Sequence, residues 1–201
     1  YPIKGIMLVG NDFINHNYCF CETCKKEFSV ISGISEDFDY NRISLDADLS
    51  QKWAKWKSDK LLALINHLVN LINQTNDNLE VGIELYWDPF TDFNKRTEIE
   101  FGQNIQEAVD RFNIVLNIYP WSPILPQIGS VEYKSFLSSL SFTRTLERKG
   151  KDFSILYWNV NNEEDLAVLK SIKQELGAKK IFSYNSFPTK YTEMRESHID
   201  R

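Results

Sequence analysis

The stretch Leu79–Pro89, LEVGIELYWDP, has the length and composition of a β-strand with two unlike faces. Successive side chains of a strand point to opposite faces, so one face is apolar and the other carries two acids. The two sets are Ile83, Leu85 and Trp87 on one face, and Gly82, Glu84, Tyr86 and Asp88 on the other. An open sheet covered by helices buries both faces, whereas a closed barrel can carry polar side chains on its inward face near the mouth. The stretch therefore favours a barrel.

Four more strand patterns occur in the chain, each followed by a helical pattern or a long polar segment. The strands are the apolar run from Ile3 to Gly10, Phe112–Pro120, Phe153–Asn159 and Lys180–Phe187. The helices are Gln51–Ile72, Thr97–Arg111, Val131–Arg148 and Glu163–Leu176. This unbroken βα order predicts an α/β fold, either the C-terminal five βα units of a (β/α)8 TIM barrel or an open parallel α/β sheet. The polar strand faces and the lack of a Gly-x-Gly-x-x-Gly turn favour the barrel.

The length suits one domain, and we expect the whole chain, 201 residues, to form a single partial TIM-barrel domain. The sequence begins without Met and directly at a strand pattern. A barrel of this type needs eight strands. The N-terminal barrel strands are therefore expected upstream, which makes the upstream half of the same barrel a partner of this chain.

Charge and composition exclude several classes of partner. The net charge is −5, and the lysines are scattered among acids without a basic stripe, which argues against nucleic acid. No apolar run approaches the roughly 18 residues of a membrane span. Three cysteines within six residues do not form a disulfide framework. The composition leaves the cellular location open.

Carboxylates follow the predicted strands at positions where α/β proteins place chemistry, the carboxyl ends of parallel strands. Asp12 follows the first strand, and Glu84 and Asp88 lie at the end of the second. Two acids flanking a site can hydrolyse a glycosidic bond, one protonating the leaving oxygen and the other attacking or activating water. Aromatic and amide side chains at the strand ends would bind the sugar: Asn11, Tyr86, Asn117, Tyr119, Trp121, Tyr157 and Asn159. The alternative is that these aromatics only pack and the acids only cap helices.

The segment Tyr18–Cys24, YCFCETC, places Cys19, Cys21 and Cys24 in a C-x-C-x-x-C cluster. Thiolates at this spacing can hold three positions of a tetrahedral Zn²⁺, with a fourth ligand from His16 or from upstream. A structural zinc is one interpretation, and three reduced cysteines without metal is the other. No organic cofactor is expected.

The run GND, then NYCFCETCKKEF, then a W-x-x-W-K helix resembles the fourth-strand region of the family 42 β-galactosidases and of uncharacterised glycosyl-hydrolase-like TIM barrels. The stretches IELYWDP, NIYPWS, SILYWN and KKIFSYNSF are similar to strands five to eight of those families. The resemblance spans nearly the whole chain, but only the cysteine loop is distinctive. It implies zinc at Cys19, Cys21 and Cys24, with a further cysteine upstream.

The chain departs from the family 42 pattern at both catalytic positions. That family ends its fourth strand with Asn-Glu, where this chain has Asn11-Asp12, and its nucleophile is a Glu at the end of strand seven, where this chain has Tyr157, Trp158 and Asn159. A reacting group misplaced by about 1 Å can cost two orders of magnitude in rate. The chain is more similar to barrels of the α-amylase and α-galactosidase type, with an Asp nucleophile at strand four and the acid at strand five or six.

These observations predict a glycoside hydrolase that acts on an oligo- or polysaccharide. Asp12 would be the nucleophile or base, Asp88 the acid and Glu84 a supporting residue. One alternative is a catalytically inactive carbohydrate-binding or scaffold barrel, because strand seven ends without a carboxylate. Another is an open-sheet α/β protein that uses its cysteines for redox chemistry or metal binding.

Overall fold

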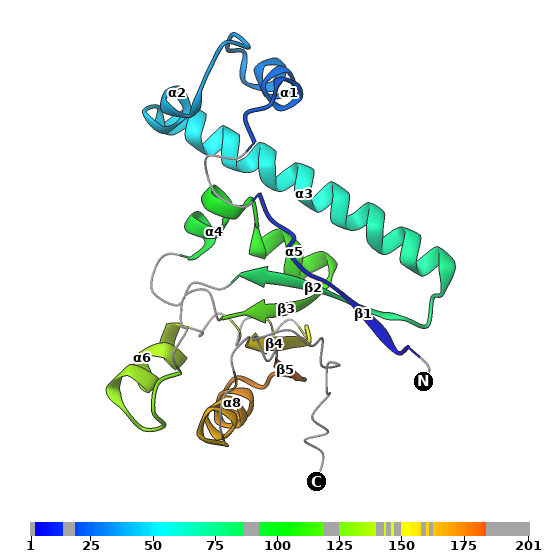
Figure 1. Cartoon of the computed structure of the whole chain (residues 1–201), viewed down its shortest axis with the longest axis vertical. Coiled ribbons are helices and arrows are strands. Elements are labelled where there is room, and N and C mark those ends of the chain that lie inside the picture. Colours follow the sequence, from blue (N-terminus) through cyan, green and yellow to red (C-terminus); the bar gives the residue numbers. More distant parts are fainter. Residues whose placement is uncertain are drawn as a thin grey trace, which may run out of the picture. The chain divides into compact units, whose positions relative to one another are not determined.

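The computed structural model describes residues 3–13, 19–86, 93–118, 125–139, 143, 146, 150–157, 160 and 163–183. Its strands are β1 (Gly5–Leu8), β2 (Glu80–Tyr86), β3 (Asn113–Asn117), β4 (Phe153–Tyr157) and β5 (Ile181–Ser183). Its helices are α1 (Glu22–Ser32), α2 (Tyr40–Ser44), α3 (Ala47–Thr75), α4 (Phe93–Phe101), α5 (Ile105–Arg111), α6 (Val131–Ser139) and α8 (Glu163–Leu176). Figure 1 shows their course along the chain.

The five strands form one parallel sheet in the order β1-β2-β3-β4-β5. Neighbouring parallel strands need a right-handed crossover, so a sequential order sends successive crossovers to the same side of the sheet. This is the order of a (β/α)8 barrel, while a doubly wound sheet reverses direction at a switch point. The predicted α/β fold with barrel-type strand order is confirmed.

Two compact units make up the chain and are described separately: Tyr1–Val81 with Asp92–Arg111, and Gly82–Thr91 with Phe112–Arg201. In the first unit, β1 approaches the start of β2 closely. The N–H of Glu80 donates to the carbonyl of Lys4 at 3.1 Å. A Cβ on Gly5 would lie 2.7 Å from the Glu80 carbonyl oxygen, so only glycine fits there.

The long helix α3 begins four residues before the predicted start at Gln51, because Asp46 caps it. The Asp46 carboxylate accepts the N–H groups of Asp48 and Leu49 at 3.1 and 3.2 Å. The segment Ser32–Ser50 is rich in Asp, Ser, Asn and Gly, a composition typical of an irregular loop, but it contains the short helix α2.

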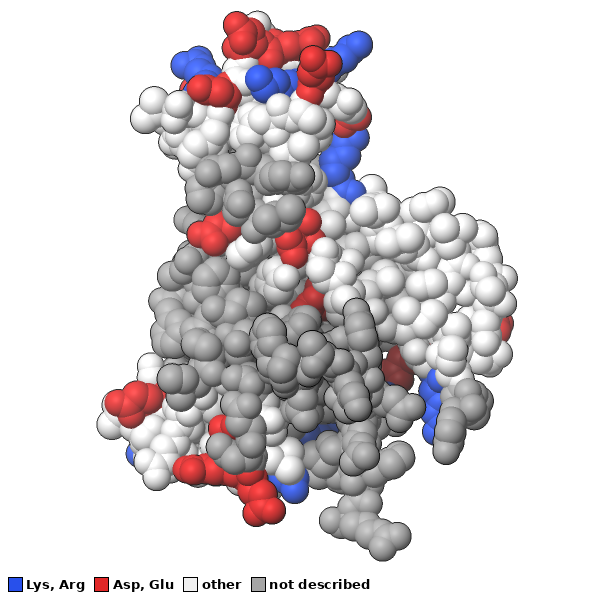
Figure 2. All heavy atoms as spheres, viewed as in Figure 1, with Lys and Arg blue, Asp and Glu red and all other residues white. Residues whose placement is uncertain are grey.

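An aromatic core joins α1, α2 and α3 in the first unit. Its buried members are Phe28, Phe38, Ile43, Leu49, Trp53 and Trp56, with Phe20, Cys24 and Ile34 packed against them. Phe20 stacks on Trp53 with ring centroids 4.8 Å apart. On the face shown in Figure 2, acidic and basic side chains are interspersed over α1 and α2, at the top of the view. Lys60 pairs with Glu27 between α3 and α1.

A single helix was predicted for Thr97–Arg111, but the structure has two, α4 and α5. Gly102 separates them with φ of 72°, in the left-handed region that ends helices. Its N–H donates to the carbonyl of Glu98 at 3.0 Å, which closes α4.

In the second unit the strand register defines the two faces of the sheet. Glu84 pairs with Val115, which pairs with Ser154, and Asn117 pairs with Leu156. Paired residues of parallel strands point to the same side.

Helix α8 has the predicted bounds and ends at Gly177, whose φ is 69°. None of the helices in the described ranges combines the length and the hydrophobicity that a membrane span requires.

Candidate functional site

The loop after β1 carries the predicted catalytic residue Asp12. Asn11 closes this loop on the strand, since its side-chain amide donates to the carbonyl of Leu8 at 2.6 Å. The N–H of Asp12 donates to the carbonyl of Gly10 at 3.0 Å. Both Asn11 and Asp12 are half-buried. The amide predicted to contact sugar therefore shapes the turn that presents Asp12.

The junction between α4 and α5 contacts the same loop. The side-chain amide of Gln103 donates to the carbonyl of Asn11 at 2.7 Å, and the N–H of Phe13 donates to the carbonyl of Phe101 at 3.0 Å. Gln103 is 1% exposed. It was not among the predicted site residues, because the sequence contains no signal that links positions 92 residues apart.

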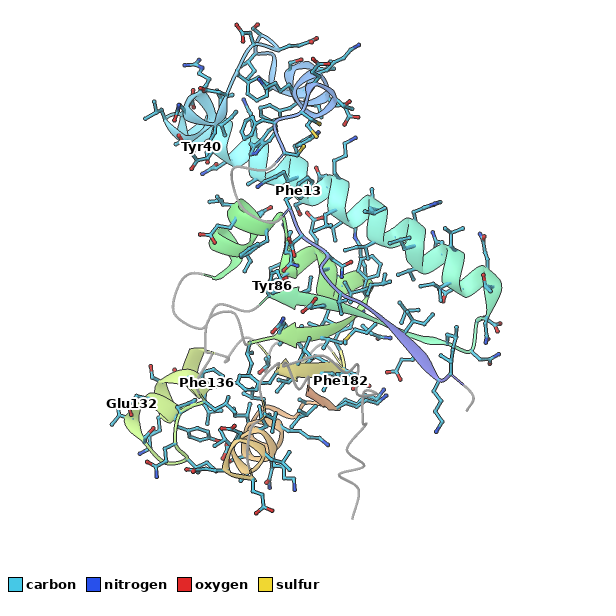
Figure 3. All side chains as sticks on the ribbon, in the orientation of Figure 1. Phe13, Tyr40, Tyr86, Glu132, Phe136 and Phe182 are labelled. Atoms are coloured by element: carbon cyan, nitrogen blue, oxygen red, sulfur yellow. The ribbon has the colours of Figure 1, made fainter. Side chains whose placement is uncertain are left out.

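Lys57 is a second residue that sequence reasoning missed. It lies on the buried side of α3 and is 0% exposed. Its ammonium donates to the carbonyl of Ile99 at 2.7 Å and lies 5.7 Å from the ring centroid of Phe13. Burial lowers its pKa to about 8, against a smaller opposing effect of Glu100. Figure 3 shows Phe13 between α3 and the α4 region.

In the second unit, Glu84 and Asn117 form a buried pair on neighbouring strands. The Asn117 side-chain amide donates to a Glu84 carboxylate oxygen at 2.6 Å. Glu84 is 2% exposed and Asn117 is 1% exposed. A buried carboxylate needs such a hydrogen-bond donor, because burying a carboxylate without one costs roughly several kcal/mol of desolvation free energy. Glu84 and Asn117 thus lie on one face of β2 and β3, and both side chains are buried there.

The two predicted tyrosines in the described strands lie on different faces. Tyr86 pairs with Asn117 in the register, so it shares the face of Glu84, and it is half-buried. It is labelled in Figure 3 at the end of β2. Tyr157 pairs with Ser183 and lies on the opposite face of β4 from Leu156, the partner of Asn117. Tyr157 is 1% exposed, so the structure does not bring it together with Glu84 and Asn117.

Several predicted site residues lie outside the described part of the chain. They are the predicted acid Asp88, the predicted sugar-binding residues Tyr119, Trp121 and Asn159, and the proposed zinc ligand His16.

The three cysteines lie together at the start of α1. Their sulfur atoms are all within 4.8 Å of one another, and none forms a disulfide. Cys21 is exposed at the N-cap position, and Cys24 packs against the aromatic core. Four thiolates around zinc, each about 2.3 Å from the ion, lie roughly 3.8 Å apart in tetrahedral geometry. The donor type and the spacing therefore fit a metal ion.

Hydrogen bonds and burial separate the acidities of these thiols. The backbone N–H of Cys24 and the neighbouring thiols of Cys19 and Cys24 lower the pKa of Cys21. Burial, together with Cys21 and Cys19, raises the pKa of Cys24 to about 12. A bound cation would reverse the shift at Cys24, because a coordinating thiol is deprotonated.

Comparison with known proteins yields a structural match. No family model matches the chain, and no curated protein matches its sequence. A solved structure, the PgaB (BpsB) glycoside hydrolase domain from Bordetella bronchiseptica, is similar with a TM-score of 0.67 and 17% identity. The match covers 92% of this chain and 52% of the other, so this chain spans about half the length of that structure. The match shows that this chain shares the fold of about half of that solved structure.

Proposed function

We propose that this chain contributes strands and catalytic carboxylates to a glycoside hydrolase that cleaves O-glycosidic bonds of an oligo- or polysaccharide. The observation that carries the proposal is Asp12, half-buried in the loop after β1. The peptide groups on both sides of it are hydrogen-bonded, and the chain shares its fold with part of a glycoside hydrolase domain.

Asp12 would act as nucleophile or base and Asp88, which follows the next strand in sequence, as acid. Glu84 has a supporting role, since its carboxylate is buried and bonded to Asn117. Asn11 shapes the Asp12 turn, and Tyr86 is half-buried at a strand end. Tyr119, Trp121 and Asn159 complete the proposed sugar site, while the position of Tyr157 supports no contact with sugar.

The test is turnover of aryl glycosides and polysaccharides by the whole protein. Asp12→Asn and Asp88→Asn are compared with Asp37→Asn, which changes an exposed acid before α2. The proposal expects loss of turnover in the first two variants and unchanged turnover in the third. Equal turnover in all three would contradict it.

An inactive carbohydrate-binding barrel is the second candidate, favoured by the lack of a carboxylate in Tyr157-Trp158-Asn159. Calorimetric titration of the protein with the same polysaccharides distinguishes the hydrolase from the inactive barrel. Binding of the polysaccharide without hydrolysis by the wild type supports the inactive barrel.

We further propose a structural zinc ion held by Cys19, Cys21 and Cys24. The support is the sulfur cluster and the contact of Cys24 with the aromatic core, which together would tie the start of α1 to the α2–α3 core. Metal analysis with thiol titration tests it, because zinc-bound thiolates react slowly with thiol reagents and free ones quickly. One zinc per chain with slow thiols is expected, and fast thiols without metal would contradict it.

A further inference from the structure

The junction between α4 and α5 makes a close contact with the loop after β1. A Cβ on Gly102 would lie 2.8 Å from the Phe13 ring and 3.3 Å from the Lys57 Cβ. The lack of room for a Cβ and the positive φ both restrict position 102 to glycine. The break in the helix therefore lets the junction reach the loop.

Two hydrogen bonds from this junction flank Asp12. Gln103 donates its side-chain amide to the carbonyl of Asn11, and Phe101 accepts the N–H of Phe13. The peptide groups before and after Asp12 are thereby held by residues about 90 positions later in the chain. Gln103 is itself held in place, because its side chain is buried and its backbone N–H donates to the carbonyl of Thr97 at 3.2 Å.

Lys57 holds the other side of this contact. Its ammonium donates to the carbonyl of Ile99 in the last turn of α4, and the partial negative charge at a helix C-terminus favours a cation there. The same ammonium lies over the Phe13 ring. The last turn of α4 is thus anchored to α3.

We propose that Gln103 is a positioning residue for the Asp12 carboxylate. The inference rests on the proposed function of Asp12. Catalytic groups must be held within about 0.5 Å of their productive position by a packed and hydrogen-bonded surrounding. The Gln103 side chain bonds the peptide next to Asp12 from outside the loop, and without it the Asn11 carbonyl loses this donor.

The experiment uses Gln103→Met in the full-length protein, which keeps the side-chain volume and removes the donor. Gln106→Met, an exposed glutamine on α5, is the matched control, and Gln103→Asn is a milder second variant. Hydrogen exchange of residues 11–13 is compared with that of β3, and kcat and KM are measured on the substrates above.

Gln103→Met is expected to speed exchange at residues 11–13 by about tenfold and leave β3 unchanged. It is expected to lower kcat about tenfold or more with KM within roughly twofold, because the loop moves but sugar contacts remain. Gln106→Met should match the wild type in both measurements.

Unchanged exchange at residues 11–13 in both Gln103 variants overturns the inference. Faster exchange with wild-type kcat overturns it as well. If the wild type hydrolyses nothing, the proposed function fails, and the exchange comparison then decides separately whether Gln103 holds the loop.

Discussion

Two amide side chains hold two acids in different ways. In the first unit, Gln103 bonds the peptide next to Asp12, which is half-buried. In the second unit, Asn117 bonds the carboxylate of Glu84 itself, and both are buried. Holding an acid through its backbone fixes its position without using the carboxylate. Holding it through the carboxylate uses one of its oxygens and removes it from water. The first arrangement suits a reacting acid and the second a supporting one.

The largest effect that tests this comparison is on rate. Asp12→Asn should lower kcat/KM by about a thousandfold, within the range for loss of an acid, base or nucleophile, and change stability by less than about 1 kcal/mol. Glu84→Gln should lower kcat/KM far less, because Asn117 can still donate to the new amide oxygen. Steady-state kinetics and urea unfolding measure both. A greater loss of rate in Glu84→Gln than in Asp12→Asn would reverse the assignment.

The next effect is on the stability of the buried pair. Asn117→Leu should destabilise the protein by about 2–4 kcal/mol, because Glu84 is left buried without its amide donor. Asn113→Leu, an exposed asparagine on the same strand, should change stability by less than about 0.5 kcal/mol. Equal effects of the two changes in urea unfolding would show that the pair contributes nothing.

A pH-dependent effect of smaller size tests the Lys57 contact behind the Asp12 loop. Burial lowers the pKa of Lys57 from 10.5 to about 8, so between these pH values the unfolded chain binds a proton that the folded chain does not. Stability from this group therefore rises with pH across that window. Relative to wild type, Lys57→Met should lose about 2–3 kcal/mol of stability between pH 7.5 and pH 10.5. A constant difference across this range would mean that burial does not lower the pKa of Lys57.

The smallest effect uses Asp46 as an internal standard, an acid whose carboxylate only caps a helix. Asp46→Ala should cost about 1 kcal/mol of stability, whereas Asp46→Asn should cost little because Asn also caps well. Neither should change kcat. If Asp46→Ala lowered kcat as Asp12→Asn does, loss of rate would reflect general destabilisation.

Local patterns predicted much of the fold. Glu163–Leu176 has the helix bounds expected from its apolar period and its terminal Gly177. Glu84 and Asn117, both predicted near strand ends, lie on one face of the sheet in the structure. The break at Gly102 was missed, because a glycine inside a helical pattern is often tolerated and here the contact with Phe13 requires it.

The sequence by itself determined the strand and helix order, the alternation within each strand and the close spacing of the cysteines, because these depend on residues near one another in the chain. The tertiary structure decided which faces meet. Register between strands separated Tyr157 from Asn117, although both end apolar strands. Folding also placed Gln103 beside Asn11 and buried Lys57 against Ile99. Such contacts join positions more than 40 residues apart, and no local period encodes them.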